Sequence, residues 1–343
     1  MKQKISRRTF MAGTAAAIAA PWIPGASRAA DQPFLLRCSL DTAPSHKRNV
    51  AFKDYLQKLE AASKGKIQTK LFDSGQLFPD LQVAKALIQN QVEMACPGSW
   101  AITGIVPNCD IFQIPALYGR SADEVHKIMD FKAGRVLDAD IQQKLRSQSM
   151  GPWLDLGYEN WYSTNRPLNS LADFKGLKIR NSGGAGQAWR ARFVGGIPNT
   201  TPWPQVPLSL SQGVSDAVVS TNESLVSAQL WDAGIKYAFE DHQFFAMYIP
   251  IVSSAFMAKL TPDLRDLVTG IWADNIVAYR ANMAEAQTNA RTILESHNVK
   301  FTDPTPEQTA KARASMMPDQ EGLAKELKLS PELVKIVMDG LPS

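Results

Sequence analysis

The sequence predicts an α/β protein of two layered domains that one long helix braces. Short apolar strands alternate with helices from Phe34 onward, a pattern typical of layered α/β domains with a mostly parallel sheet. The chain has 343 residues, and a mature part of roughly 310 residues is long enough for two buried cores. Helical spacing over residues 262–296 predicts a helix about 50 Å long at 1.5 Å per residue, enough to contact both domains.

The first block of elements precedes Pro97. Gly65 ends its first helix, and Ser74-Gly75-Gln76-Leu77 forms a turn between its second strand and its second helix. Strands are expected over 34–40, 67–72 and 92–96, and helices over 52–59 and 81–89.

A second block begins near Gly157. Residues 200–207 form a loop that prolines interrupt, and Trp203 lies in it. A break near Gly270 would divide the long segment into two helices, which is the alternative to one continuous helix. Strands are expected over 161–164, 178–180, 214–219 and 248–259, and helices over 184–193, 208–212 and 262–296.

Residues 1–29 predict export from the cytoplasm. Ser6-Arg7-Arg8-Thr9-Phe10 resembles a twin-arginine signal, and a short apolar run and the small residues around Ala29 follow it. An ordinary secretory signal is the alternative. The mature chain is expected to start near Ala30 or Asp31, and no later segment is apolar enough to span a bilayer.

The basic composition of the whole chain does not indicate a protein that binds nucleic acid. The chain has 37 Lys and Arg against 33 Asp and Glu. Five of the basic residues lie in the predicted signal, so the mature chain has 32 basic residues against 33 acidic ones, a formal charge of −1. No basic patch with interleaved aromatic residues is present.

The cysteines and histidines do not predict a metal site, a cofactor or a catalytic centre. Cys38, Cys96 and Cys109 allow at most one disulfide, and buried free thiols are the favoured interpretation. The four histidines are far apart in the sequence, and no HExxH, GxSxG, Walker A or GxGxxG motif occurs. We therefore expect no metal, no cofactor and no enzymatic activity.

The segment Lys178-Ile179-Arg180 predicts a site for an organic acid. It reads as a short strand that ends at Gly183 and Gly184 before a helix, and such a junction leaves backbone N–H groups free to attract an anion. Arg180 adds a planar guanidinium that can bind a carboxylate through two hydrogen bonds. An exposed arginine at a strand end is the alternative.

Five motifs in the same order resemble the solute-binding proteins of tripartite ATP-independent periplasmic (TRAP) transporters, the DctP-like family. The resemblance covers nearly the whole mature chain, and its most specific block is Asp173-Phe174-Lys175-Gly176-Leu177-Lys178-Ile179-Arg180. The other blocks are Ser63-Lys64-Gly65-Lys66-Ile67, Ser74-Gly75-Gln76-Leu77, Phe112-Gln113-Ile114-Pro115-Ala116-Leu117, and Leu210-Ser211-Gln212-Gly213-Val214-Ser215-Asp216.

The resemblance implies a two-lobed fold of the periplasmic-binding-protein type (type II) that closes on a small organic acid and delivers it to two membrane permease subunits. It places the substrate carboxylate on Arg180 and makes Trp203 a wall of the cleft. Lobe I would comprise residues 30–157 and 246–285, and lobe II residues 158–245 and 286–343. The other expected substrate-binding residues are Gly98, Ser99, Trp100, Asn160, Asn181, Ser220 and Asn222.

Three departures from the family pattern bear on the substrate. Asn160 stands where many members have a second arginine, which weakens the case for a dicarboxylate. Ala217 replaces the usual glycine after Asp216, and Ser220 stands where members that bind sialic acid have asparagine. Trp100, Trp161 and Trp203 are the aromatic candidates for the cleft, and core packing of two of them is the alternative.

The leading hypothesis is a periplasmic substrate-binding protein of a TRAP transporter. A twin-arginine-exported enzyme with a cofactor is the alternative, and a receptor for a signalling partner is a third. The sequence does not identify the acid.

Overall fold

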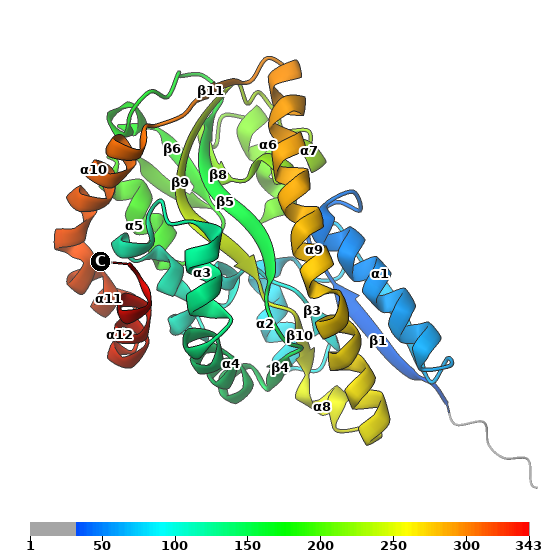
Figure 1. Cartoon of the computed structure of the whole chain (residues 1–343). Helices are drawn as coiled ribbons and strands as arrows, with labels where there is room; N and C mark the ends of the chain where they lie inside the picture. The colour runs from blue at the N-terminus through cyan, green and yellow to red at the C-terminus, as the bar shows by residue number, and fades with distance from the viewer. Residues whose placement is uncertain (1–31, 343) are drawn as a thin grey trace, which may run out of the picture. The chain divides into compact units, whose positions relative to one another are not determined.

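The computed structural model describes residues 32–342, which form two β-sheets with helices packed around them (Figure 1). The α/β class predicted from the alternation of strands and helices is confirmed. The predicted export signal, residues 1–29, lies outside the described residues.

In the first sheet four strands run in one direction and one strand, β10, runs in the opposite direction. β1 pairs in parallel with β2 and with β3, whereas β10 is antiparallel to both β3 and β4. The strands in sheet order are β2 (Ile67–Phe72), β1 (Phe34–Ser39), β3 (Met94–Ala95), β10 (Ile251–Ser253) and β4 (Ser147–Ser149).

The second sheet is also mixed. β5 is antiparallel to both β9 and β8, while β6 is parallel to β8 and β7. The expected mostly parallel sheet is confirmed by strand direction, because β10 in the first sheet and β5 in the second each run opposite to both neighbours while the remaining strands of each sheet share one direction. The strands in order are β11 (Lys300–Thr302), β9 (Tyr237–Tyr248), β5 (Leu154–Ser163), β8 (Ala217–Ser220), β6 (Lys178–Asn181) and β7 (Ile197–Thr200).

The expected long strand over 248–259 is wrong. The chain forms the short β10 there and then the helical turn α8 (Ser254–Met257), whereas the long strand is β9, which ends at Tyr248. An apolar run such as this one fits a strand or a buried helix equally well, so its pattern does not separate the two.

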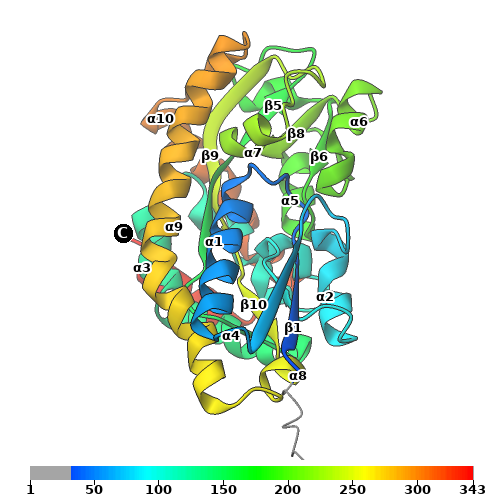
Figure 2. The ribbon, with the colours of Figure 1, turned by 90° about the vertical axis from the view of Figure 1, so that its right-hand side faces the viewer.

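The helix over residues 262–296 is continuous, as predicted. Pro262 occupies its first turn, and Asn298, at φ +64°, follows its end in the left-handed conformation typical of a helix stop. Its buried residues recur every three or four positions from Leu264 to Leu294, which gives one apolar stripe. This helix, α9, contacts both α1 and α7, and Figures 1 and 2 show α1 alongside it.

The remaining helices cover the sheets or join them. They are α1 (Lys47–Ala62), α2 (Asp80–Ile88), α3 (Ala122–Met129), α4 (Lys132–Leu145), α5 (Ala185–Phe193), α6 (Val206–Ser211), α7 (Asn222–Ser227), α10 (Pro306–Met316), α11 (Gln320–Glu326) and α12 (Pro331–Gly340).

The C-terminal helices pack against the part of the chain that the sequence analysis assigned to lobe I. α12 contacts α3 and α4, and α10 contacts the 3₁₀ turn Pro115–Leu117. The packing of residues 306–340 thus differs from their predicted assignment to lobe II. The sequence of these helices predicts an apolar face, but it does not indicate which lobe that face packs against.

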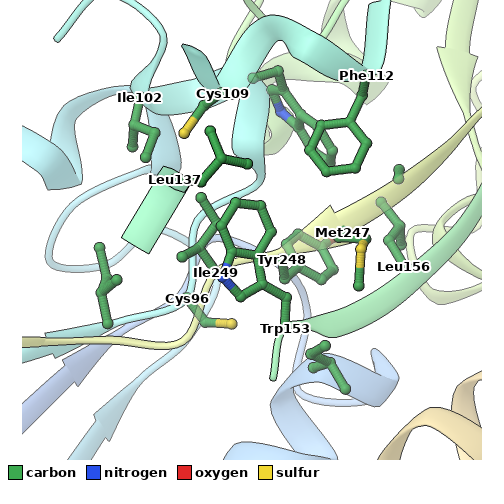
Figure 3. Packing of buried hydrophobic residues seen from close by; sticks show 14 of the residues in the cluster. Cys96, Ile102, Cys109, Phe112, Leu137, Trp153, Leu156, Met247, Tyr248 and Ile249 are labelled. Atoms are coloured by element: carbon green, nitrogen blue, oxygen red, sulfur yellow. The ribbon is translucent and has the colours of Figure 1, made fainter. Parts of the chain in front are cut away.

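The core contains the three cysteines as buried free thiols, as the sequence analysis favoured. Figure 3 shows Cys96 and Cys109 in the same cluster as Phe112, Trp153 and Ile249. Burial raises the pKa of the Cys96 thiol well above its usual range, because a thiolate there would lose its hydration. Among residues 32–342, none of the helices is both long and apolar enough to cross a membrane.

Candidate functional site

One pocket lies where the carboxyl ends of strands from both sheets meet. Asp41 follows β1, Ser182 follows β6 and Ser220 ends β8, so the location agrees with the general rule for ligand sites in α/β folds. The lining residues are Asp41, Thr42, Asp80, Leu81, Trp100, Leu156, Glu159, Arg180, Ser182, Trp203, Ser220, Ser224 and Tyr248.

The pocket is nearly shut. Its volume is about 30 Å³, room for roughly two water molecules, whereas pockets for small-molecule ligands measure about 300–1,000 Å³. At its edge the backbone of Gly183 closely approaches the opposite side, because a Cβ added there would lie 2.9 Å from Leu81 Cδ2. A solute larger than two waters therefore needs the two sides to move apart.

Arg180 of β6 lines this pocket, and hydrogen bonds to neighbouring protein groups fix its side chain. Asp216 accepts the backbone N–H of Lys178 at 2.9 Å and so fixes the start of the strand. The Arg180 Nε donates to the carbonyl of Thr201 at 2.9 Å, and Nη1 donates to Ser182 Oγ at 2.9 Å. None of the hydrogen bonds within residues 32–342 uses Nη2.

Arg180 is a buried cation without an acidic partner among the described residues. It is 2% exposed, and no carboxylate of residues 32–342 forms an ion pair with it. Burial lowers the pKa of its guanidinium to about 10, and the nearby Glu159 opposes that shift. A buried guanidinium with an unused Nη2 group can donate charge-assisted hydrogen bonds to a carboxylate.

Glu159, which the sequence analysis missed, lines the pocket where Asn160 was expected. The pairing of β5 with β9 shifts register between Glu159 and Trp161, and such a bulge turns neighbouring side chains to new directions. Asn160 is not among the lining residues. Its amide instead donates to the carbonyl of Tyr158 at 3.2 Å and accepts the N–H of His242 at 3.0 Å.

The Glu159 carboxyl is buried without a hydrogen-bond partner in the described part of the chain. The residue is 1% exposed, and its Oε2 makes no hydrogen bond within residues 32–342. Burial raises the pKa of Glu159 to about 8, although the charge of Arg180 pulls that pKa down.

A second arginine, Arg48 of α1, lies behind the pocket lining, and all three of its side-chain nitrogens already donate hydrogen bonds to protein groups. Its Nη2 donates to Asp41 at 2.6 Å and its Nη1 to Asp80 at 2.8 Å. The guanidinium also lies 4.2 Å from the ring centroid of Tyr248. Arg48 therefore neutralises the two aspartates rather than offering a free edge to a solute.

Trp100 and Trp203 line the pocket from two 3₁₀ turns, one after β3 of the first sheet and the other after β7 of the second. The half-buried Trp203 lies in the 3₁₀ turn Trp203–Gln205, and its ring centroid is 5.3 Å from Arg180 Cζ. Trp203 also packs against the smaller of the two apolar clusters, so it contacts both cleft and core. Trp161 is fully buried and donates its indole N–H to Asp241 at 2.7 Å, which makes it a core residue.

Other expected site residues do not line this pocket. Gly98 leaves room for the Trp100 ring, since a Cβ there would lie 2.2 Å from it, and Ser99 is buried beside it. Asn181 accepts a hydrogen bond from Thr200 at 2.9 Å, and Asn222 accepts one from Tyr162 at 2.8 Å. Their roles in binding stay predictions, and so do those of Arg180, Trp100, Trp203 and Ser220.

The structure adds residues that the sequence analysis did not select. Asp41 and Thr42 directly follow the first strand, so their position at a strand end was a usable signal. The others come together only through tertiary packing and are Asp80, Leu81, Leu156, Glu159, Ser182, Ser224 and Tyr248.

A polar contact joins the two sides next to the pocket. His46, before α1, accepts the backbone N–H of Arg48 at Nδ1 (3.1 Å), so its Nε2 carries the proton. Nε2 forms a hydrogen bond with Ser224 Oγ of α7 at 3.2 Å and lies 2.9 Å from the Glu223 carboxylate. Both groups are buried, so separating the two sides would expose a polar contact that the present arrangement satisfies.

The family model described as bacterial extracellular solute-binding protein, family 7 (DctP), matches residues 39–326. The chain belongs to this family. The predicted relationship to DctP-like TRAP solute-binding proteins is therefore confirmed, and a solute-binding role follows from it.

Curated relatives in the family are distant in sequence. The C4-dicarboxylate-binding periplasmic protein DctP of Shewanella loihica is 25% identical over 284 residues, which is 81% of each chain. The 2,3-diketo-L-gulonate-binding periplasmic protein YiaO of Escherichia coli is 23% identical over 230 residues, 67% of this chain and 69% of the relative.

Solved structures show the same two-lobed fold. The sugar acid binding protein DctPAm of Advenella mimigardefordensis, in complex with galactonate, has a TM-score of 0.84 at 20% identity and covers 90% of this chain and 98% of its own. A TRAP periplasmic solute-binding protein of Sulfurospirillum deleyianum with bound succinate has a TM-score of 0.82 at 20% identity and covers 90% and 100%. The predicted fold class is thus confirmed.

Proposed function

We propose that this member of the family captures a small organic acid in the pocket between its two lobes and delivers it to the membrane permease subunits of a TRAP transporter. The observation that carries the proposal is the buried Arg180, which lines the pocket and whose Nη2 makes no hydrogen bond within residues 32–342. Galactonate and succinate, which the related structures hold, are both carboxylates.

The pocket offers a site for one carboxylate. Arg180 is the lining arginine with an unused donor edge, because Arg48 already binds Asp41 and Asp80. Asn160 lacks a cationic group and is bonded to the backbone. A second solute carboxylate would have to be buried without a cation opposite it, which is costly.

Capture would proceed by a change in the distance between the two lobes. The nearly shut pocket excludes entry of a solute in the present arrangement, so an open state must exchange with it. A carboxylate on Arg180 gains the contacts of the opposite side only in the closed form, and we expect the permease to recognise that form.

The chain would reach the periplasm by the twin-arginine pathway. The support is the Arg7-Arg8 pair with Phe10 in residues 1–29 and the membership in a family of extracellular solute-binding proteins.

A thermal-shift screen against monocarboxylates and dicarboxylates tests the proposal. A solute at 100 times its Kd adds about 2.7 kcal/mol to the free energy of unfolding, which gives a clear shift in Tm. We expect monocarboxylates to stabilise the chain and small-angle scattering to show a smaller radius of gyration with the best of them. A chain that no organic acid stabilises would contradict the proposal.

A further inference from the structure

Of the carboxylates in the pocket lining, two are satisfied by the protein. Asp41 accepts Arg48 Nη2 at 2.6 Å on one oxygen and the backbone N–H of Asp80 at 3.1 Å on the other. Asp80 accepts Arg48 Nη1 at 2.8 Å and the backbone N–H of Gly98 at 3.2 Å. These two carboxylates and Arg48 form a closed hydrogen-bonded unit and leave little for a solute to bind.

Glu159 is the contrasting case. It is as buried as those two aspartates, yet neither a cation nor a hydrogen-bond donor of residues 32–342 contacts its Oε2. Buried polar atoms in folded proteins nearly always have a partner, and an unpaired buried carboxyl is expensive. An atom of this kind in the wall of a solute pocket indicates that the partner comes with the solute.

The backbone places Glu159 there specifically. Without the register shift between Glu159 and Trp161, the alternation along β5 would change which side chain faces the pocket. The bulge is matched on β9 by His242, which has φ +50° and donates its N–H to Asn160. The position of the carboxyl therefore rests on an irregularity in two paired strands and not on a flexible surface side chain.

Arg180 and Glu159 give the pocket a cation and an acid that are both uncommitted. They line the same cavity, but no ion pair within 4 Å joins them in the described chain. A simple carboxylate on Arg180 would hold Glu159 in its protonated form, because two negative charges repel strongly in this low-dielectric space, whereas a cation would favour the ionised carboxylate. A solute with a cation as well as a carboxylate would satisfy both side chains.

We infer that the solute is an amino carboxylate, with its carboxylate on Arg180 and its cationic nitrogen on Glu159. The inference rests on the proposed function and narrows its substrate class. Trp100, Trp203 and Leu156 provide apolar walls around the two charged groups, which suits a short carbon chain or small ring between the nitrogen and the carboxylate.

Titration calorimetry with matched pairs of compounds tests this inference. The probes are the standard α-amino acids and the ω-amino acids of two to six carbons, each compared with the same acid without the amino group. The full mature chain should bind at least one amino acid about 100-fold more tightly than its partner without nitrogen. The Glu159→Gln variant should bring the two compounds within about tenfold of each other.

Matched controls keep the test specific. Glu240→Gln makes the same change on β9, where the carboxylate bonds to Asn222 and Arg291 outside the pocket, and it should keep the full preference. The Arg180→Ala variant should bind neither compound of a pair measurably. Thermal unfolding of Glu159→Gln without solute checks that the variant is folded.

Two results would separate the inference from the proposed function. If acids without nitrogen bind the wild-type chain as well as the amino acids do, or if Glu159→Gln strengthens their binding, the solute is not a zwitterion, although the chain remains a carboxylate-binding protein. If neither set nor the wider panel of acids binds, the proposed function itself is wrong.

Discussion

Gly157 of β5 pairs directly with Ala246 of β9, at the place where the sequence analysis put two boundaries between the lobes, so hinges are expected there. The pairing shifts register next to Gly157, whose φ of +120° is a conformation that favours glycine. Gln287 of α9 packs against this point and donates to the carbonyl of Leu156 at 2.6 Å. Two hinge segments in one strand pair would bend together, and α9 would limit how far they bend.

Gly157→Ala should destabilise the fold and impair closure. The new Cβ would require a strained backbone and would lie 3.1 Å from Gln287. We expect a loss of about 1–3 kcal/mol in the free energy of unfolding, measured by urea denaturation. Gly270→Ala is the control, because its Cβ would meet open space inside a helix, and it should stabilise by about 0.5–1 kcal/mol. Equal effects of the two changes would argue against a strained hinge.

Gly98→Ala should weaken solute binding through Trp100. Gly98 has φ −65°, which alanine adopts easily, but a Cβ would lie 2.2 Å from the Trp100 ring. The ring must shift out of its place in the pocket, so we expect about tenfold weaker binding by calorimetry and a stability loss of about 1–3 kcal/mol. Gly104→Ala, with nothing near its Cβ, should change neither quantity. Unchanged affinity for Gly98→Ala would show that Trp100 does not shape the site.

Solute binding should change the tryptophan fluorescence mainly through Trp203. Its ring lies against Arg180 in the pocket, so a bound carboxylate alters its surroundings. Trp203→Phe should remove most of the change, whereas Trp189→Phe, on α5 outside the pocket lining, should keep it. Persistence of the full signal in Trp203→Phe would make Trp100 the reporter and reduce Trp203 to a packing role.

The stability of the solute-free chain should fall as the pH rises from about 4.5 to about 8, in part because of Glu159. Burial raises the pKa of Glu159 from 4.5 to about 8, so the folded chain holds a proton that the unfolded chain has released. This stability contribution is complete below the unfolded pKa and is lost as the pH rises through about 8.

Urea unfolding at pH 5 and pH 9 measures that effect. Glu159→Gln should lose less stability between the two pH values than the wild type. Asp80 and Asp241, whose pKa values burial raises to about 7, act in the same direction in both proteins and cancel in the comparison. Identical pH dependence of the two proteins would mean that the Glu159 pKa is not raised.

Local sequence signals were sufficient for much of the fold and for part of the site. Lys178–Asn181 reads as a strand, and Arg180 at its end lies in the pocket, because short-range patterns determine both. Glu159 could not be selected, since the bulge that directs it depends on pairing with β9, some 80 residues later in the chain. Likewise, Asp80 joins the site through hydrogen bonds with Arg48 and Gly98, which lie in other segments of the chain.

Titration calorimetry of Arg180→Ala is the most direct test of the account, with the tightest-binding carboxylate from the screen. The loss of a buried charge-assisted pair costs about 2–5 kcal/mol, so micromolar affinity should fall to roughly millimolar or become unmeasurable. Arg192→Ala removes an exposed arginine of α5 that pairs with Glu326 and should bind like the wild type. Near-normal affinity of a folded Arg180→Ala variant would contradict the account.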